Sequence, residues 1–329
     1  MIPYPMKLEP ILMQRLWGGR RLAEMFGKVL PDEQPYGESW EVSDVPAHAS
    51  VIVNGPLTGR SLRDLMVEDA AGLLGEARCA EGGRFPLLVK LLDCSDVLSV
   101  QVHPDEAACR LLGGHARPKT ESWIVLHADP GAKIYLGLAA GVTRPQFEAA
   151  LAEGTVEKLL NVIEPAVGDC LYITSGTVHA LGAGLVLAEI QQTSDTTYRV
   201  YDWGRLGPDG RPRPLHVEQA LASIHFVEAE PPTPQVPRPL EGSDGVEGAV
   251  LLDEPYARIC RLASVTPFTI EGSGVATILQ CVGGDAMLTG GGQRVRIATG
   301  DAILLPAAVE DVDVEPISEG VALLTSKPK

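Results

Sequence analysis

Short apolar runs separated by turn residues dominate the chain and predict a mainly β protein. Four such runs are HASVIVNG (48–55), SWIVLH (122–127), AKIYLGL (132–138) and DCLYIT (169–174), all rich in β-branched or aromatic residues. The 35 glycines and 26 prolines of the chain punctuate these runs. Many short strands with turn signals between them are typical of a β sandwich or barrel.

Three stretches instead have the 3.6-residue spacing of a helix. The first, 61–75, places leucine and methionine side chains on one face. The second, 142–160, begins with a start signal, because Thr143 and Gln146 can form a capping box. The third covers 217–224. We therefore expect a few helices that decorate a β core.

Composition excludes some classes of function. The chain has 27 basic and 43 acidic residues, a net charge of −16, which argues against nucleic acid as a partner. No apolar run approaches the length of a membrane span, and the first residues lack the pattern of a signal peptide. The six cysteines form no CxxC pair and are expected to be free thiols. We expect a cytoplasmic protein without a membrane partner.

A scattered set of polar residues has the chemistry of a metal site. Gln101 and His103 are two positions apart, so their side chains leave the same face of a strand. Glu121 and His179 would complete the set from other strands. Either histidine alone would more often be an ordinary one. Two imidazoles, a carboxylate and an amide oxygen together suit Zn²⁺ or another divalent ion.

The segment that ends in His179 has a second copy. GDCLYITSGTVH (168–179) and GDAILLPAAVED (300–311) both run from Gly-Asp through an apolar stretch to a polar residue eleven positions after the glycine. The second copy ends in Asp311, and no QxH precedes it. We interpret residues 1–228 as a catalytic, metal-binding domain, 229–248 as a proline-rich linker, and 249–329 as a degenerate copy without a metal site.

Several segments together resemble type I mannose-6-phosphate isomerases in their short bacterial form. They are LSVQVHPDE, KTESW, SGTVHALG and EIQQTSDTTYRVYDWGR, with RLWGGRRL and GESWEVSD similar to the family's N-terminal segments. GDCLYITSGTVH also resembles the second motif of cupins, with Thr174 where proline is common. The resemblance implies two cupin-type β-jelly-roll domains. The chain departs from longer members in reading KTE for KPE and in lacking a large helical insertion.

The resemblance also implies roles for individual residues in interconverting mannose 6-phosphate and fructose 6-phosphate through an enediol or enediolate. One Zn²⁺, or another divalent ion, would be bound by the ligand set Gln101, His103, Glu121 and His179. Arg199 would be catalytic, and it would bind the substrate together with Lys119 and Ser99. Arg199 could hold the phosphate or stabilise the enediolate. Glu189 is the first candidate for the proton carrier, with Asp195 and Lys119 as rivals.

Two other functions remain open from the sequence. One is an iron-dependent cupin oxygenase, and the other is a cupin that binds a sugar phosphate without turning it over. Gln101 and the basic residues near the site favour a phosphosugar substrate over oxygen chemistry. The oligomeric state is expected to be a monomer or a homodimer.

Overall fold

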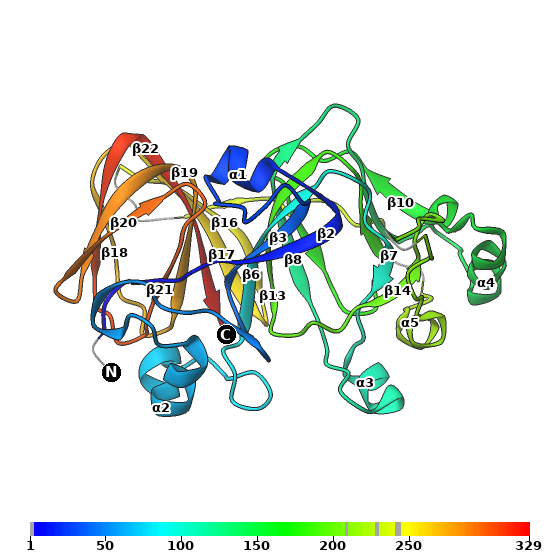
Figure 1. Ribbon diagram of the computed structural model, residues 1–329, viewed down its shortest axis with the longest axis horizontal. Helices are drawn as coiled ribbons and strands as arrows, with labels where there is room; N and C mark the ends of the chain where they lie inside the picture. The colour runs from blue at the N-terminus through cyan, green and yellow to red at the C-terminus, as the bar shows by residue number, and fades with distance from the viewer. Residues whose placement is uncertain (1–2, 208–209, 228–229, 241–244) are drawn as a thin grey trace.

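A computed structural model describes residues 3–207, 210–227, 230–240 and 245–329. Three large antiparallel sheets and one two-stranded sheet make the protein mainly β, as the sequence predicts. In Figure 1 a nine-stranded sheet occupies the left half, and the other two large sheets form the right half. The helices α3, α4 and α5 surround the right end, whereas α2 lies below the left half.

The right half pairs a six-stranded sheet with a five-stranded one. The six-stranded sheet has the order β11-β8-β13-β6-β3-β2 and contains β2 (Ile11–Gly19), β3 (Tyr36–Val42), β6 (Leu87–Cys94), β8 (Glu121–Ala128), β11 (Cys170–Ile173) and β13 (Leu185–Gln192). The five-stranded sheet has the order β10-β9-β12-β7-β14 and contains β7 (Val100–Val102), β9 (Ile134–Leu138), β10 (Leu160–Ile163), β12 (His179–Leu181) and β14 (Tyr198–Tyr201). Three of the four runs read as strands from the sequence are β8, β9 and β11.

The left half is built from the C-terminal part of the chain. Its sheet contains β15 (Arg238–Pro239), β16 (Glu247–Glu254), β17 (Ala257–Ser264), β18 (Phe268–Ile270), β19 (Thr277–Gly290), β20 (Gln293–Ala298), β21 (Ala302–Leu305) and β22 (Val312–Pro328). The N-terminal strand β1 (Met6–Lys7) joins this sheet by pairing with β21. The first residues of the chain therefore belong structurally with the last eighty.

The run 48–55 is the exception among the predicted strands. Only β4 (Asp44–Val45) and β5 (His48–Ala49) pair there, followed by isolated bridges at Val51 and Ile52 and the 3-10 turn η1 (Gly55–Leu57). The apolar side chain of Ile52 is buried all the same. A short apolar run can satisfy its burial without a continuous ladder, which periodicity does not reveal.

The three predicted helices exist, with two further short ones. They are α1 (Arg21–Phe26), α2 (Leu62–Leu74), α3 (Glu106–Leu112), α4 (Arg144–Glu153) and α5 (Val217–Ser223). At the start of α4 the Thr143 N–H donates to Gln146 Oε1 at 2.8 Å, half of the predicted capping box. This helix stops at Gly154, which has φ 69°, and η2 (Val156–Leu159) follows, so it is shorter than 142–160. No helix in these described ranges is long and apolar enough to cross a membrane.

The duplicated sequence motif forms the same strand pairing twice, β11 with β8 and β21 with β19. Gly168 N–H donates to Val125 O at 2.8 Å, and Gly300 N–H donates to Cys281 O at 2.8 Å. Both glycines have a positive φ, 95° and 92°, which side chains rarely adopt. The strands β11 and β21 begin two residues later in both copies. The repeat in the sequence is therefore a repeat in the backbone.

The predicted linker, 229–248, is partly outside the described chain and partly in strands. Residues 229 and 241–244 lie outside the described part of the chain. Within 229–248, β15 pairs with β16, and β16 itself begins at Glu247. An apolar cluster joins the two halves, since it includes Val89 and Ile190 from the right and Ile259 from the left. The domain boundaries themselves stay a prediction.

Candidate active site and metal centre

One row of residues across the five-stranded sheet contains three of the predicted site residues. Gln101 on β7 lies directly opposite His179 on β12 and, on its other side, opposite Arg199 on β14. Residues paired directly across antiparallel strands project from the same face of a sheet. The pairing of three short strands therefore directs these side chains to one side, although 78 residues separate His179 from Gln101 in the chain.

The described residues include one group whose side chains could hold a metal ion. His103, Glu121 and His179 each offer a ligand atom, and these atoms all lie within 4.8 Å of one another. His103 Nε2 is 3.3 Å from Glu121 Oε2, and His179 Nε2 is 3.4 Å from Glu121 Oε1. All three side chains are no more than 1% exposed. Such a compact group of buried nitrogen and oxygen ligands suits a divalent cation.

The hydrogen bonds of this group leave its ligand atoms unsatisfied. His103 Nδ1 lies 3.0 Å from Thr196 O, and His179 Nδ1 lies 2.9 Å from Thr177 O, so each Nδ1–H can donate to a carbonyl. The Nε2 atoms and both Glu121 oxygens are buried and have no hydrogen-bond partner among the described residues. Buried polar atoms without partners are rare and costly. These atoms fit a metal ion, because metal-binding imidazoles commonly donate their other N–H to a backbone carbonyl that orients the ring.

The charge states agree with metal binding. Burial, followed by the nearby Lys119 ammonium, lowers the pKa of His103 to about 4. Burial also lowers the pKa of His179. Burial alone would raise the pKa of Glu121, but Lys119 and His103 outweigh it and hold this pKa well below its usual range. Neutral imidazoles and an ionised carboxylate are the forms that bind metals.

Lys119 lies beside this group, as the sequence predicts. Its Nζ is 2.8 Å from Glu121 Oε2, an ion pair without the geometry of a hydrogen bond. The Lys119 side chain is 6% exposed and lines a cavity of about 370 Å³. The ammonium group is therefore placed between the candidate metal ligands and the space where a substrate would bind.

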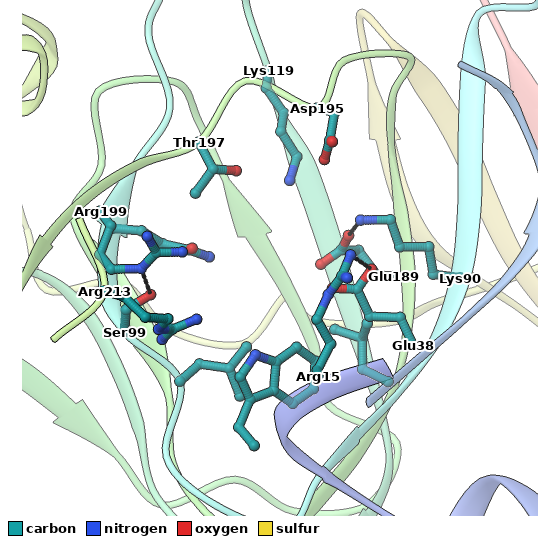
Figure 2. A pocket seen from close by; sticks show the side chains of 14 residues that line it. Arg15, Glu38, Lys90, Ser99, Lys119, Glu189, Asp195, Thr197, Arg199 and Arg213 are labelled. Carbon is teal, nitrogen blue, oxygen red and sulfur yellow. Dashed lines mark hydrogen bonds and ion pairs between the residues drawn. The ribbon is translucent and has the colours of Figure 1, made fainter. Parts of the chain in front are cut away.

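That cavity contains most of the other predicted residues (Figure 2). Ser99, Gln101, Glu189, Asp195 and Arg199 all line it. The side chains drawn in Figure 2 come from both facing sheets and from the loop that carries Asp195 and Thr197. The structure thus gathers every predicted site residue at the cavity or at the buried histidine–glutamate group next to it.

Glu189 is held by two donors in this cavity. Lys90 Nζ lies 2.8 Å from Glu189 Oε1, and Trp123 Nε1 donates to Glu189 Oε2 at 3.1 Å. Neither oxygen of Glu189 contacts His179, whose Nδ1 faces Thr177 O instead. Trp123 does reach His179, with ring centroids 5.4 Å apart in an edge arrangement.

A second carboxylate completes a charged wall. Glu38 accepts from Arg15 Nε at 2.8 Å and from Trp40 Nε1 at 2.6 Å. Burial raises the pKa of Glu38, but Lys90 and Arg15 outweigh it and lower this pKa to about 2. Burial lowers the pKa of Lys90, but Glu189 and Glu38 outweigh it and raise this pKa above its ordinary value. The wall is thus ionised and neutralised internally.

Arg199 differs from the other cations of the cavity. Its Nε donates to Ser99 Oγ at 3.3 Å and its Nη1 to Pro214 O at 3.0 Å. Arg213 pairs with Asp202 at 2.6 Å, whereas Arg199 has no ion pair with a carboxylate of the described chain. Burial, and then the neighbouring Arg213, lower the pKa of Arg199. An uncompensated guanidinium in a cavity of an acidic protein is suited to an anionic ligand.

Sequence reasoning missed four charged residues of this cavity: Arg15, Glu38, Lys90 and Arg213. A signal existed for Lys90, because it interrupts the apolar run LLVKLL of β6, whose eight residues are all buried. A lysine in such a strand needs a partner. Glu38 lies in the quoted segment GESWEVSD, where no role was assigned to it. Arg15 begins the quoted segment RLWGGRRL, where no role was assigned to it either. Nothing local marks Arg213, which reaches the cavity only through the fold.

Comparisons with known proteins agree with this geometry. The family model of phosphomannose isomerase type I, catalytic domain, matches residues 6–120. A Streptococcus mutans mannose-6-phosphate isomerase is 35% identical over 318 residues, which cover 95% of this chain and 97% of that protein. A probable mannose-6-phosphate isomerase from Bacillus subtilis is 42% identical over 221 residues, covering 67% of this chain and 68% of that protein.

A solved structure extends the likeness to the whole fold. The crystal structure of mannose 6-phosphate isomerase from Bacillus subtilis matches with a TM-score of 0.87 and 30% identity, covering 98% of this chain and 99% of that one. The predicted cupin-type jelly-roll class is the fold of these relatives. With near-complete coverage by a relative of this identity, the chain belongs to the type I phosphomannose isomerase family.

Proposed function

We propose that this protein is a metal-dependent aldose–ketose isomerase that interconverts mannose 6-phosphate and fructose 6-phosphate. The buried group of His103, Glu121 and His179 carries the proposal, since its ligand atoms have no hydrogen bonds within the described residues and it adjoins a cation-rich cavity. Five cations and three carboxylates line that cavity, in a chain whose net charge is −16. A local positive excess in an acidic protein favours an anionic substrate.

The proposed metal ligands are Gln101, His103, Glu121 and His179, with one Zn²⁺ per chain. A bound Zn²⁺ would act as a Lewis acid on the oxygens of the sugar where negative charge develops. Gln101 is neutral, so it would leave the site more electrophilic than a second carboxylate would. Another divalent ion is compatible with the same donors.

Arg199, Lys119 and Ser99 are proposed to bind the substrate. Arg199 offers free guanidinium N–H groups and is held in place by Ser99 and the Pro214 carbonyl. A guanidinium can bind a phosphate in a bidentate way or stabilise an enediolate. Lys119 lies beside Glu121 and can contact sugar hydroxyls near the reacting carbons.

Glu189 is proposed as the group that carries the proton between the two carbons. Its carboxylate is oriented by Lys90 and Trp123 and lines the cavity. A fixed carboxylate can take a proton from one carbon and return it to the next without reorganising. Asp195 also lines the cavity but is exposed, and Lys119 is already paired with Glu121.

The main test follows fructose 6-phosphate formation from mannose 6-phosphate before and after chelation, with metal analysis of the purified protein. We expect chelation to abolish activity and Zn²⁺ to restore it. His179→Ala should lose both metal and activity, whereas the exposed His115→Ala should keep both. Activity that survives complete metal removal would exclude the metal mechanism.

The same samples separate the rival functions. An iron-dependent oxygenase would consume oxygen and depend on iron, and a non-catalytic binder would bind mannose 6-phosphate tightly without converting it. Either result, together with no fructose 6-phosphate, would replace the proposal.

The proton carrier needs its own experiment. Glu189→Gln, Asp195→Asn and Lys119→Met would be compared for exchange of the substrate C2 hydrogen with solvent. We expect Glu189→Gln to lose exchange and turnover together, while Asp195→Asn retains exchange. The opposite ranking would move the assignment to Asp195.

We further propose a cytoplasmic location and a monomer or homodimer. All six cysteines are free, which supports a reducing compartment. Fractionation of cells and sedimentation of the purified protein would test the two statements separately.

A further inference from the structure

The nine-stranded sheet encloses a second cavity, of about 660 Å³. Its polar lining includes Arg258 and Cys260 on β17, Thr277 on β19, and Thr325 and Lys327 on β22. The strands concerned lie in the left half of Figure 1, away from the catalytic cavity. None of these residues belongs to the site described above.

The backbone repeat relates this cavity to the catalytic one. In the first copy Ile173 at the end of β11 pairs with Glu121, and in the second Leu305 at the end of β21 pairs with Thr277. Thr277 therefore occupies the sheet position of the candidate metal carboxylate. The second cavity is the structural counterpart of the first, with a hydroxyl in place of the central carboxylate.

The neighbouring positions follow the same correspondence. Lys90 pairs with Glu189 across β6 and β13, and Cys260 pairs with Thr325 across β17 and β22. The buried lysine–glutamate pair is thus replaced by a thiol and a hydroxyl. The described lining of this cavity therefore has no carboxylate at these positions, although the cavity itself is present.

Two cations lie two residues along the same strands from Cys260 and Thr325. Arg258 and Lys327 lie directly opposite each other on adjacent strands, and both line the cavity. Neither has an ion pair or side-chain hydrogen bond with any described residue. Burial is the main cause that lowers the pKa of Lys327. Cys260 raises this pKa by less than burial lowers it, and the Arg258 guanidinium lowers it further. Like charges directly opposite in a sheet destabilise it. Asp253 lies opposite Arg258 on its other side, but it forms ion pairs with Arg238 and Lys329 and is not part of the cavity lining.

The hydroxyl groups of Thr325 and Thr277, beside the two cations, also have unused hydrogen-bonding capacity. Thr325 is 6% exposed, and its hydroxyl has no hydrogen bond within the described residues. Thr277 Oγ1 donates to Val275 O at 3.2 Å, which leaves its lone pairs free. The acidic lining residue is Glu271, and it is exposed. The interior therefore offers donors and positive charge, and its one described carboxylate is open to solvent.

We propose that this second cavity binds a small organic phosphate monoester, with the phosphate between Arg258 and Lys327. A phosphate monoester carries about −1.5 to −2 charges at pH 7, which matches two cations. Thr325 can donate to a phosphate oxygen, and the apolar side chains of Leu262, Phe268 and Ile270 form a wall for the organic part. The ligand relieves the repulsion between the two cations, so binding stabilises the sheet.

Binding of phenyl phosphate to the metal-loaded protein, measured by titration calorimetry, tests the proposal. The wild type is expected to bind at a site that Arg258→Ala and Lys327→Ala each weaken about tenfold to hundredfold, because each removes a charge-assisted contact. Arg199→Ala should remove only binding in the catalytic cavity. Arg261→Ala is the matched control on the same strand, since Arg261 pairs with Glu247 outside the cavity. Binding that disappears in Arg199→Ala and is unchanged in Arg258→Ala would overturn the second site.

Two further measurements sharpen the chemistry. Benzoate and inorganic phosphate should both bind more weakly than phenyl phosphate, since one has a single charge and the other lacks the apolar part. Equal binding of benzoate would overturn the phosphate assignment. Without ligand, Arg258→Ala should unfold at no lower temperature than the wild type, because it relieves repulsion. A clear loss of stability would show instead that Arg258 has a structural partner.

Discussion

The two halves of the molecule build the same strand pairing and place different side chains on it. In the right half the row across β8 and β13 contains Glu121, which faces two histidines. In the left half Thr277 occupies the position of Glu121, and Arg258 and Lys327 lie opposite each other on β17 and β22. The backbone positions are shared, so the repeat specifies where a cavity forms but not which side chains line it. A candidate metal group and a pair of cations are built on the same backbone pattern.

The halves also differ in how their buried charges are balanced. In the catalytic cavity the charges of Arg15, Glu38, Lys90 and Glu189 cancel as a group. In the second cavity Arg258 and Lys327 form no ion pair within the described residues, and Asp253, opposite Arg258, is paired with Lys329. A cavity wall whose charges cancel is expected to be stable without ligand. A wall with two cations and no paired carboxylate is expected to depend on a bound anion. The difference can be tested by changing each half separately.

The largest expected difference concerns the metal position. Glu121→Ala should reduce fructose 6-phosphate formation by roughly a thousandfold or more, because the carboxylate ligand and its charge are both lost. Asp311→Ala, at the position that matches His179 in the second copy, should stay within about twofold of the wild type, since its carboxylate is exposed and accepts one described hydrogen bond, from Gly272 N–H at 3.1 Å. Equal losses in both variants would mean that both halves contribute to catalysis.

Arg199 should give the next largest effect. Arg199→Ala is expected to lower kcat/KM by about a hundredfold to a thousandfold. A rise in KM alone would indicate uniform binding of the phosphate, and a fall in kcat would indicate stabilisation of the enediolate. Arg261→Ala in the other half serves as the control. A normal kcat/KM in Arg199→Ala would remove this residue from the site.

Acid should weaken the catalytic half through Glu38. The pKa of this carboxyl is lowered from 4.5 to about 2, so its contribution is present above pH 4.5 and is lost as the pH falls towards 2. The contribution is up to about 3 kcal/mol of unfolding free energy. Chemical unfolding of the wild type at several pH values should therefore show a steeper loss than Glu38→Gln shows. Parallel curves would contradict the pKa assignment.

The two glycines that precede β11 and β21 should give the smallest difference between the halves. Both have a positive φ, so replacement by alanine should cost about 1–2 kcal/mol in either copy. A Cβ on Gly168 would meet nothing within 4 Å, whereas one on Gly300 would lie 2.6 Å from Phe26 Cβ. Gly300→Ala should therefore destabilise by about 1–3 kcal/mol more than Gly168→Ala. Thermal unfolding of the two variants would measure the difference. Equal midpoints would show that α1, which ends at Phe26, shifts to make room for the new methyl group.

Local patterns predicted the elements best where a cap or a repeat marked them. The capping residues before Arg144 identified the start of α4, and Gly154 determined an end that periodicity alone placed too late. The QVH spacing with Glu121 and His179 pointed to a group that the fold does bring together. The resemblance to the family added Arg199, Lys119, Ser99 and Glu189. Lys90 and Glu38 were missed because a charged residue in a strand reveals no partner on a distant strand.

From its sequence alone this protein could be recognised as mainly β, with helices at the stated places, a repeated β motif and a set of candidate metal ligands. These features depend on local propensity, spacing and residue chemistry. Only the tertiary structure decided that β1 joins the C-terminal sheet, that Lys90 pairs with Glu189, and that Arg258 lies opposite Lys327. Such contacts depend on strand register between distant segments. Register is set by packing of the whole sheet, which no local pattern contains.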